Sequence, residues 1–313
     1  MKYRKLGKTD CEVSILSYGA SALGSVFRNI DEQEGMAAVH AAFDVGINYF
    51  DTSPFYGITE SERILGNALK EHARDSYILS TKSGRFGWDA FDFSTKRILR
   101  SVEESLQRLH VEYLDIVNLH DIEYKGGEFT EQALFEGLSA LQQLKKEGKI
   151  RYYGIATYPL DLIRRVVESI PLDTVMNHKL YTLSDTRLLG LLPLLKEKEI
   201  GLIHSAPLGS GFLSSRGVAS WHPATEGDKA IVQKAAACCK AQGSSIEKLA
   251  IQFATSHPDI PTCLVSSASK ERIRSNAACL GEPMDEALIK EVRTILQPVS
   301  DRDWDDFSEK ELK

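Results

Sequence analysis

The chain has 313 residues, of which 42% are hydrophobic, and its formal net charge is −6. This length fits either two small domains or one large α/β barrel, and both would bury a sizeable core. The acidic balance excludes the broad basic surface that binds a nucleic-acid backbone. No apolar run approaches the roughly 20 residues that cross a bilayer, and the charged N-terminus does not resemble a signal peptide. Composition therefore favours small-molecule chemistry in a soluble protein that binds neither nucleic acid nor membranes.

Cysteine usage indicates the compartment. The five cysteines are Cys11, Cys238, Cys239, Cys263 and Cys279. Their number is odd and no two have C-x-x-C spacing, so they predict neither a disulfide framework nor a zinc site. We therefore expect no bound metal and a cytoplasmic location.

The N-terminal part of the chain precedes the main repeat. Residues 3–15 contain two short β-prone segments around the turn-forming Gly7-Lys8-Thr9-Asp10, which predicts a hairpin that caps the floor of the fold. A first strand is expected at residues 15–19. The acidic residues 31–34 then precede apolar residues at helical spacing, as expected for the start of a helix.

From residue 47 onward, short apolar strands alternate with helical segments. The further strands are expected at residues 47–51, 77–81, 114–119, 151–156, 173–176, 201–205 and 261–265. Helices are expected at residues 61–70, 94–109, 131–147, 160–168, 185–196 and 228–257. Eight strands thus alternate with helical regions, which predicts parallel strands joined by right-handed crossovers.

Eight such α/β units close a (β/α)8 TIM barrel, typically of about 250 residues, and we expect residues 1–313 to form one barrel domain with an N-terminal β-hairpin. The alternative is an open doubly wound sheet. The glycines at positions 19 and 24 do not have the G-x-G-x-x-G spacing of a dinucleotide-binding loop, which disfavours that alternative. Gly209-Ser210-Gly211 follows the seventh strand, where barrels often bind phosphate, although a plain flexible loop fits it equally well.

Four residues that can exchange protons or hold charge lie at or just beyond the ends of strands two to four: Asp51, Tyr56, Lys82 and His120. In a parallel barrel these ends share one mouth, so the four side chains can meet in a single site. Lys82 would lower the pKa of Tyr56 by stabilising its phenolate, and Asp51 would hold the ammonium in place. His120 would bind a substrate oxygen or share the proton of the tyrosine.

Each of these residues also has an ordinary structural explanation. Asp51 fits a turn or a cap, Tyr56 a packed loop aromatic, Lys82 a solvated surface residue, and His120 a local hydrogen bond with Asp121. Singly, these explanations are the more common ones. Their joint placement at three successive strand ends favours an acid/base cluster instead.

The stretch Phe50-Asp51-Thr52-Ser53-Pro54-Phe55-Tyr56-Gly57, with Thr81-Lys82 and Leu119-His120, resembles the Asp-Tyr-Lys-His tetrad of the aldo-keto reductases. The eight-unit pattern resembles their barrel over essentially the whole chain. Within this family the chain is most similar to the aldose 1-dehydrogenases. That similarity is carried by residues 19–27, 120–123, 159–161 and 221–224.

The resemblance implies NAD or NADP bound across the barrel mouth and oxidation of an aldose, such as L-galactose, at C1 to the lactone. Tyr56 would exchange the proton, Lys82 and Asp51 would tune it, and His120 would position the substrate oxygen. Two alternatives stay open. One is a broad NADPH-dependent aldehyde or ketone reductase, and the other is a non-catalytic, redox-sensing regulatory subunit.

The resemblance also suggests contacts with the cofactor. They are assigned to Gly19, Ala20, Thr157, His178, Ser205, Leu208, Ser210, Ser266, Arg272 and Asn276. Thr157 takes the place of a side chain that binds the carboxamide, and His178 a position that is often glutamine. Ser205 replaces a tyrosine that stacks on the nicotinamide in many members, a task that Tyr181 could take over.

The adenosine end of the cofactor has a mixed pattern. Ser266 stands where NADP-preferring reductases commonly have a lysine, whereas Arg272 keeps the arginine that such enzymes use to bind a 2′-phosphate. A solvated helix residue is the alternative explanation of Arg272. The pattern favours NAD slightly and leaves NADP open.

Three aromatic residues are expected in loops at the rim of the mouth: Phe27, Trp88 and Trp221. Each could pack against a sugar face or the nicotinamide, and core or surface packing fits each equally well. The partner of this site is thus predicted to be a small-molecule sugar or carbonyl compound.

Overall fold

The chain begins with an antiparallel hairpin of β1 (Tyr3–Lys5) and β2 (Glu12–Ser14) in the computed structural model, which describes residues 1–26, 28–218 and 222–303. The turn of the hairpin lies against the start of another strand: the amide of Lys8 donates to the carbonyl of Glu199 at 2.7 Å. Gly7 has a φ of +54°, and a Cβ there would lie 2.3 Å from the amide nitrogen of Gly201, so this close approach requires glycine. The hairpin therefore caps the floor of the fold, as predicted.

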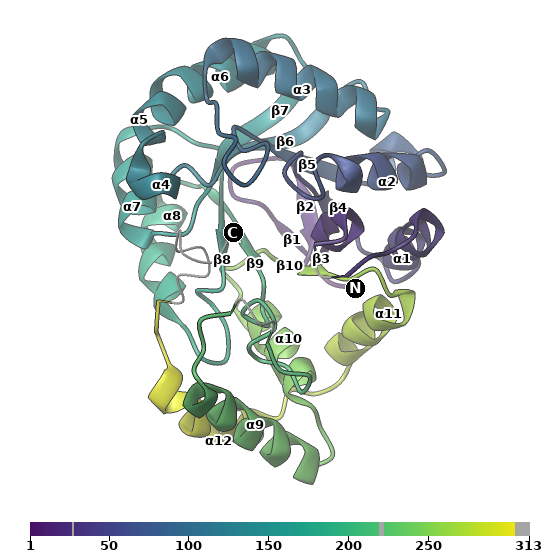
Figure 1. The fold of residues 1–313 in the computed structure, drawn as a ribbon, viewed down its shortest axis with the longest axis vertical. Helices are drawn as coiled ribbons and strands as arrows, with labels where there is room; N and C mark the ends of the chain where they lie inside the picture. Colours follow the sequence, from purple (N-terminus) through teal and green to yellow (C-terminus); the bar gives the residue numbers. More distant parts are fainter. Residues whose placement is uncertain (27, 219–221, 304–313) are drawn as a thin grey trace.

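Eight parallel strands form a closed barrel in the order β10-β3-β4-β5-β6-β7-β8-β9 (Figure 1). The strands are β3 (Leu16–Gly19), β4 (Tyr49–Asp51), β5 (Ile78–Ser83), β6 (Leu114–His120), β7 (Ile150–Ala156), β8 (Thr174–His178), β9 (Gly201–Ser205) and β10 (Thr262–Ser266). The register brings Gly19 beside Asp51 and His120 beside Ala156, so the C-terminal strand ends form one rim. This arrangement confirms the predicted (β/α)8 barrel.

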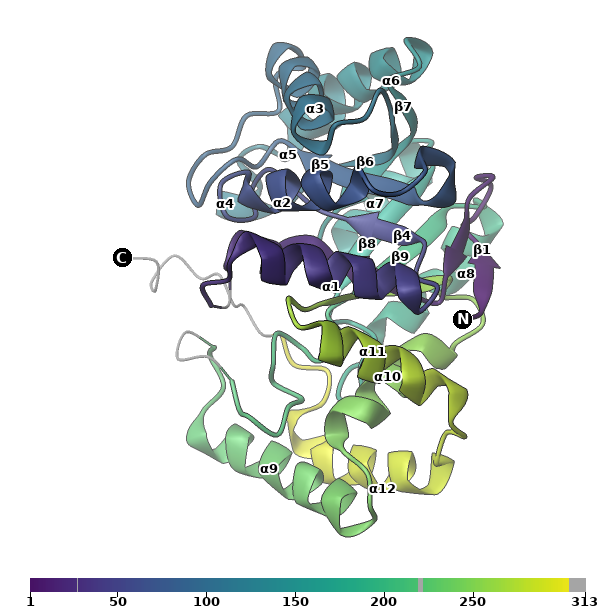
Figure 2. The ribbon, with the colours of Figure 1, turned by 90° about the vertical axis from the view of Figure 1, so that its right-hand side faces the viewer.

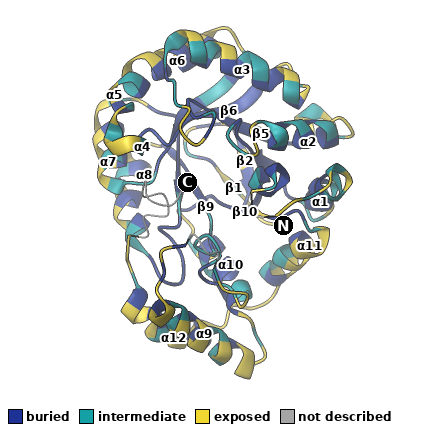
Figure 3. Ribbon diagram, viewed as in Figure 1, coloured by how far each residue is buried: buried dark blue, intermediate teal, exposed yellow. Residues whose placement is uncertain are grey.

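Helices surround the barrel. They are α1 (Glu32–Asp44), α2 (Glu60–Leu69), α3 (Thr95–Leu109), α4 (Tyr124–Gly127), α5 (Thr130–Gln132), α6 (Leu138–Lys146), α7 (Leu160–Ser169), α8 (Leu192–Glu197), α9 (Glu226–Ala241), α10 (Ile246–Ser256), α11 (Lys270–Ala278) and α12 (Glu286–Leu296). Short 3-10 turns lie at Ala20–Gly24, Arg74–Ser76, Arg187–Leu191, Cys279–Gly281 and Gln297–Val299, and a π-helical turn at Ala133–Gly137. The longer helices that pack on the strands have a buried inner side and an exposed outer side (Figure 3).

The expected start of α1 is confirmed, because the side chain of Asp31 accepts from the amide of Glu34 at 2.7 Å. The single helix expected at residues 228–257 is wrong. It is divided into α9 and α10, because Gly243 adopts a φ of +72° and Ser245 caps a new helix by accepting from the amide of Lys248. The helix expected at 185–196 begins as a 3-10 turn and becomes α-helical only at Leu192.

The strands separate two apolar layers. Inside the barrel, alternate residues of the strands pack with the hairpin: Ile116, Ala156, Met176, Ile203 and Leu264 meet Leu6, Cys11 and Val13. The intervening residues, such as Phe50, Leu79 and Val117, pack outward against the helices. Because side chains alternate along a strand, Asp51, Lys82 and His120 belong to the inward set at the end of their strands.

A third apolar cluster joins α9, α10 and α12 beside the barrel, where Figure 2 shows α9 and α12 next to each other. Within the described ranges, no helix has both the length and the apolar character needed to span a bilayer.

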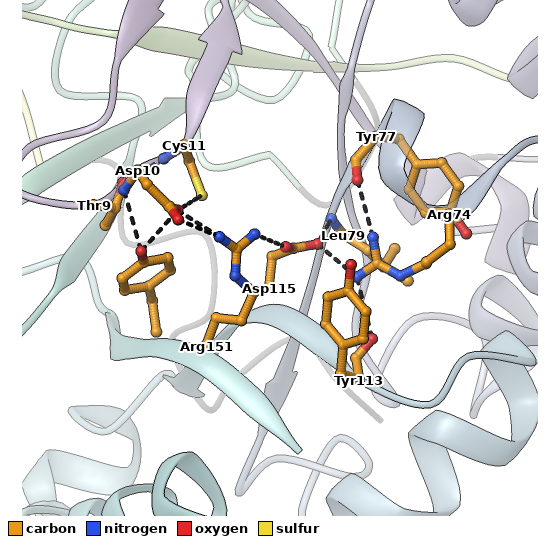
Figure 4. Close-up of polar contacts among 10 residues, drawn as sticks. Thr9, Asp10, Cys11, Arg74, Tyr77, Leu79, Tyr113, Asp115 and Arg151 are labelled. Carbon is orange, nitrogen blue, oxygen red and sulfur yellow. Dashed lines mark hydrogen bonds and ion pairs between the residues drawn. The ribbon is translucent and has the colours of Figure 1, made fainter. Parts of the chain in front are cut away.

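The floor of the barrel has its own charge network, shown in Figure 4. The buried carboxylate of Asp115 accepts from Arg74 at 2.6 Å, from Arg151 at 2.7 Å and from the amide of Leu79 at 2.9 Å. Arg151 also pairs with Asp10 of the hairpin at 2.5 Å. This network ties the hairpin to β6 and β7 at the end of the barrel opposite His120.

Candidate active site

A cavity of about 1910 Å³ opens at the C-terminal ends of the strands. Every strand of the barrel contributes an inward residue at or near its end to the lining. These residues are Gly19, Asp51, Lys82, His120, Ala156, His178, Ser205 and Ser266. The alternation of the strands therefore turns these inward residues, most of them polar, toward one space.

The floor of the cavity holds a buried ion pair. The ammonium of Lys82 contacts the carboxylate of Asp51 and donates to the carbonyl of Thr52 at 2.9 Å. The other carboxylate oxygen of Asp51 accepts from the hydroxyl of Ser80 at 2.5 Å. Both charged side chains are thus fixed by several contacts.

Tyr56 lies in the loop between β4 and α2, above this ion pair. Its ring centroid is 4.9 Å from Nζ of Lys82 and 5.8 Å from the ring of His120, to which it stands at 86°. The loop is held close to the Ala20–Gly24 turn, since a Cβ on Gly24 would lie 2.5 Å from the carbonyl carbon of Tyr56. The structure therefore brings the four predicted side chains into one cluster.

Burial dominates the charge states in this cluster. It opposes the charge of Lys82, but the Asp51 carboxylate and Tyr56 together outweigh it and hold the pKa of Lys82 above its usual range. Burial also raises the pKa of Asp51, and the ammonium offsets part of that rise.

The prediction that Lys82 lowers the pKa of Tyr56 below its usual value is wrong. Burial raises the pKa of Tyr56 above its usual value of 10, and the opposing effect of Lys82 is only partial. Tyr56 is therefore a neutral phenol near pH 7, and Lys82 limits the rise in its pKa without reversing it.

His120 is held neutral. Burial, with the charges of Lys82 and Arg85, places its pKa well below the usual 6.5. Its Nδ1 lies 3.0 Å from the hydroxyl of Ser53, and its Nε2 lies 3.4 Å from a carboxylate oxygen of Asp121. The expectation that His120 shares a proton across the working pH range is thus not met, and its neutral ring is suited to hydrogen bonding.

The charged residues of the cavity lining that sequence reasoning did not propose as site residues include Arg85, Asp121 and Glu123. Arg85 pairs with Asp121 at 2.5 Å. Burial and the neighbouring Asp121 raise the pKa of Glu123 to about 7. The available signal was their position, because Arg85 follows Lys82 by three residues, and Asp121 and Glu123 lie one and three residues after His120.

Most of the predicted cofactor contacts lie on the cavity wall. These are Gly19, His178, Ser205, Leu208, Ser210, Ser266, Arg272 and Asn276. Ala20 is buried behind the wall, and its carbonyl accepts from Ser61 at 2.7 Å. Thr157 is also buried and donates to Glu123 at 2.6 Å. Tyr181 packs on Phe253 of α10 with ring centroids 4.9 Å apart, outside the barrel, so it does not replace the aromatic residue missing at Ser205.

One wall of the cavity is rich in arginine. Arg28, Arg216 and Arg272 line it, and burial together with the charges of the other two lowers the pKa of Arg272. Guanidinium groups gathered at a cavity wall are suited to the phosphates of a dinucleotide. The residues present therefore fit the cofactor that the sequence implies. Ser266 is engaged locally, where its hydroxyl oxygen accepts from the amide of Ala22 at 2.9 Å.

The aromatic residues predicted at the rim are only partly described. Trp88 is 47% exposed and packs edge-on against Phe55, with ring centroids 5.2 Å apart. Phe55 lines the cavity, and Trp88 packs on the side of Phe55 that faces away from the cavity. Phe27 and Trp221 lie outside the described residues.

A closed parallel barrel with Tyr, Lys, Asp and His clustered at its C-terminal mouth defines a class of barrel oxidoreductases. Residues 15–297 match the model of the Aldo/keto reductase family. The chain belongs to this family of NAD(P)-dependent oxidoreductases and is an enzyme of that type.

Comparison with individual proteins agrees with this assignment. The chain is 41% identical over 313 residues to L-galactose dehydrogenase of Arabidopsis thaliana, covering 97% of each chain. It is 33% identical over 259 residues to D-arabinose 1-dehydrogenase of Saccharomyces cerevisiae, covering 78% of this chain and 76% of the relative. The holo form of aldo-keto reductase AKR11C1 from Bacillus halodurans superposes with a TM-score of 0.78 and 26% identity, covering 95% of this chain and 96% of the other.

Proposed function

We propose that this protein is an aldose 1-dehydrogenase that oxidises a sugar such as L-galactose at C1 to the lactone with NAD or NADP. The observation that carries the proposal is the ammonium of Lys82, paired with Asp51 and 4.9 Å from the ring of Tyr56 in the barrel mouth. The similarity to two named sugar dehydrogenases supports the substrate class.

Each side chain of the cluster has one role in this reaction. In its phenolate form, Tyr56 takes the proton of the C1 hydroxyl as the C1–H bond breaks and the C=O bond of the lactone forms. A bound nicotinamide supplies the acceptor for the hydride. Lys82 stabilises the phenolate, and Asp51 holds Lys82 in place. The neutral ring of His120 donates a hydrogen bond from Nε2 to the substrate oxygen.

This tautomer of His120 follows from its neighbours. The carboxylate of Asp121 lies 3.4 Å from Nε2 and can only accept, which favours a proton on Nε2 and leaves Nδ1 to accept from the hydroxyl of Ser53 at 3.0 Å. The ring proton then resides on Nε2, the nitrogen that faces Asp121. Ser53 is therefore a positioning residue for the histidine.

The proposed activity is tested with L-galactose, L-fucose and D-arabinose, each with NAD and with NADP. Tyr56→Phe should abolish turnover while nucleotide binding, followed by fluorescence titration, is retained. Tyr3→Phe is the matched control, because Tyr3 lies on the hairpin at the opposite end of the barrel and donates only to Gly46. Near-normal turnover by Tyr56→Phe would remove Tyr56 from proton transfer. Cofactor binding without turnover of any aldose would favour a carbonyl reductase if aldehydes react, and a regulatory subunit if they do not.

The cofactor is proposed to lie along the wall of Ser266, Arg272 and Asn276, with NAD slightly favoured. Arg272→Ala should weaken NADP binding about 10-fold or more and NAD binding much less, because a charged hydrogen bond to a 2′-phosphate is lost. Arg274→Ala on the same helix is the control, since Arg274 pairs with Asp44 on the outer surface. Equal losses for the two nucleotides in Arg272→Ala would contradict the assignment.

Two broader features of the proposal remain. The five cysteines are all free, and four of them are buried, which supports a reducing compartment such as the cytoplasm. The closed barrel and the family match over residues 15–297 support one domain over residues 1–313.

A further inference from the structure

We propose that the ion pair of Arg85 and Asp121 is the subsite that recognises the hydroxyl groups of the sugar, an inference that rests on the proposed function. Both residues line the cavity, and Asp121 lies next to the histidine that faces the reacting oxygen. One carboxylate oxygen of Asp121 is 2.5 Å from Nη1 of Arg85 and 3.4 Å from Nε2 of His120. The carboxylate of Asp121 therefore lies beside the nitrogen of His120 that is proposed to bind the reacting oxygen.

Stability alone does not account for this pair. The side chain of Arg85 is 1% exposed and that of Asp121 is 12% exposed, so both charges have lost most of their hydration. A buried ion pair is seldom more stabilising than apolar residues of similar volume. The pair also lies at the C-terminal mouth of a barrel, where functional residues gather, and not at the floor, where charges join strands to the hairpin. Its position indicates a role in binding.

The guanidinium of Arg85 is held rigidly. Its central carbon lies 3.9 Å from the ring centroid of Phe55 and 4.1 Å from that of Tyr124. Phe55 directly precedes Tyr56 in the sequence, so the loop that positions the phenol also positions the guanidinium. Because the side chain is ordered before the sugar binds, little conformational entropy is lost on binding.

The backbone of Asp121 is left-handed at the rim of the cavity. Its φ is +53°, a conformation that is uncommon for residues other than glycine, although aspartate tolerates it better than most. The conformation is retained while its amide donates to the carbonyl of Ala156 at 2.8 Å, at the end of the ladder between β6 and β7. This hydrogen bond anchors the backbone of Asp121 at the edge of the cavity, where its carboxylate meets Arg85.

The chemistry of the pair matches a polyol. A carboxylate accepts hydrogen bonds and a guanidinium donates them, so the two groups together complement neighbouring hydroxyls, each of which both donates and accepts. A simple aldehyde carries the reacting carbonyl but not these hydroxyls. The pair therefore selects sugars over unsubstituted carbonyl compounds.

The test compares Asp121→Asn and Arg85→Met with the unaltered enzyme. For each, kcat/KM is measured with L-galactose, with monodeoxy derivatives of galactose, and with 4-nitrobenzaldehyde in the reductive direction. For the unaltered enzyme, we expect removal of one recognised hydroxyl from the sugar to lower kcat/KM about 10- to 100-fold. In Asp121→Asn the same removal should lower kcat/KM by a factor that is about 10-fold smaller. Loss of activity toward the sugar should exceed loss toward the aldehyde by a similar factor. Circular dichroism and cofactor binding confirm folding, and Arg100→Gln, on the exposed surface of α3, is the control.

The outcomes separate this inference from the proposed function. If the unaltered enzyme oxidises aldoses but each deoxy sugar lowers kcat/KM by the same factor in the unaltered enzyme and in the variants, the subsite is elsewhere. If Asp121→Asn loses sugar and aldehyde activity in the same proportion, Asp121 acts only by positioning His120, and the recognition role is overturned. If the unaltered enzyme oxidises no aldose, the proposed function itself fails before any variant is compared.

Discussion

The buried pair of Lys82 and Asp51 allows a sharp prediction about stability. Replacing Lys82 with Met keeps the volume of the side chain and removes the only ammonium that contacts the Asp51 carboxylate among the described residues. Ser80 then remains as a hydrogen-bond donor to that carboxylate, at 2.5 Å. Because both partners of the pair are at most 4% exposed, water cannot replace the lost charge.

The expected cost follows from the burial. Removing one partner of a buried ion pair typically lowers the free energy of unfolding by about 3 to 5 kcal/mol. At about 2 to 4 °C per kcal/mol, this lowers the melting temperature by roughly 10 °C. Asp51→Asn in the same chain removes the isolated charge, so the double variant should regain most of the loss.

The loss should also depend on pH. Without Lys82, burial leaves the pKa of Asp51 raised in the folded protein, whereas the unfolded chain releases that proton near pH 4. The unfolded state then binds fewer protons, and the stability of Lys82→Met falls by up to about 1.4 kcal/mol per unit as the pH rises above 4 toward the folded pKa. Lys82→Met should therefore be closest to the unaltered protein at pH 5 and furthest from it at pH 8.

Urea denaturation of the four proteins of this double-mutant cycle, at pH 5 and pH 8, measures both effects. A loss below 1 kcal/mol in Lys82→Met at pH 8, with no recovery on adding Asp51→Asn, would show that the carboxylate finds other partners. The reasoning about burial in the cavity floor would then be wrong.

Three further predictions concern the barrel and its titrating groups. Gly154→Ala should lower the free energy of unfolding by about 3 kcal/mol or more in urea titrations, because its Cβ would lie 1.9 Å from the carbonyl oxygen of Thr174, whereas Gly190→Ala has open space and should change little. Burial holds the pKa of His204 at about 4, so as the pH falls below 6.5 the unfolded state gains the proton before the folded state and the protein loses stability. His204→Gln cannot take up this proton, so between pH 7 and pH 4.5 the variant should lose about 2 to 3 kcal/mol less stability than the unaltered protein. The kcat/KM of sugar oxidation, measured with the cofactor varied, should rise about 10-fold per pH unit from pH 7 to 9, since the pKa of Tyr56 is raised; a plateau below pH 8 would contradict this.

The fold could be predicted because its signal is local and repeated. Short apolar strands that alternate with amphipathic helices specify parallel units, and the last inward residue of each strand faces the mouth. Asp51, Lys82 and His120 were found by that rule alone. The break at Gly243 was missed because the apolar periodicity resumes after it, and a single glycine inside a helical pattern is often tolerated.

Two aspects of the site were beyond the reach of sequence patterns. The first is charge state, since the pKa of Tyr56 depends on a balance between burial and a neighbouring ammonium that only coordinates reveal. The second is the contact between loops. Arg85 and Asp121 are 36 residues apart and follow different strands, so their pairing depends on how two loops fold over the mouth.

The two ion pairs of the mouth have a joint consequence for the chemistry. Lys82 and Arg85 each add to the burial that keeps His120 neutral, and each is balanced by its own carboxylate. A neutral His120 cannot deliver a proton to the substrate at physiological pH, although it can still donate a hydrogen bond. Proton transfer is therefore left to Tyr56. Of the two cations that keep the histidine neutral, Lys82 lies on β5 beside the phenol, and Arg85 follows that strand by two residues. Tyr56 is thus the group of this site that exchanges the proton, and Lys82 limits the rise in its pKa that burial causes.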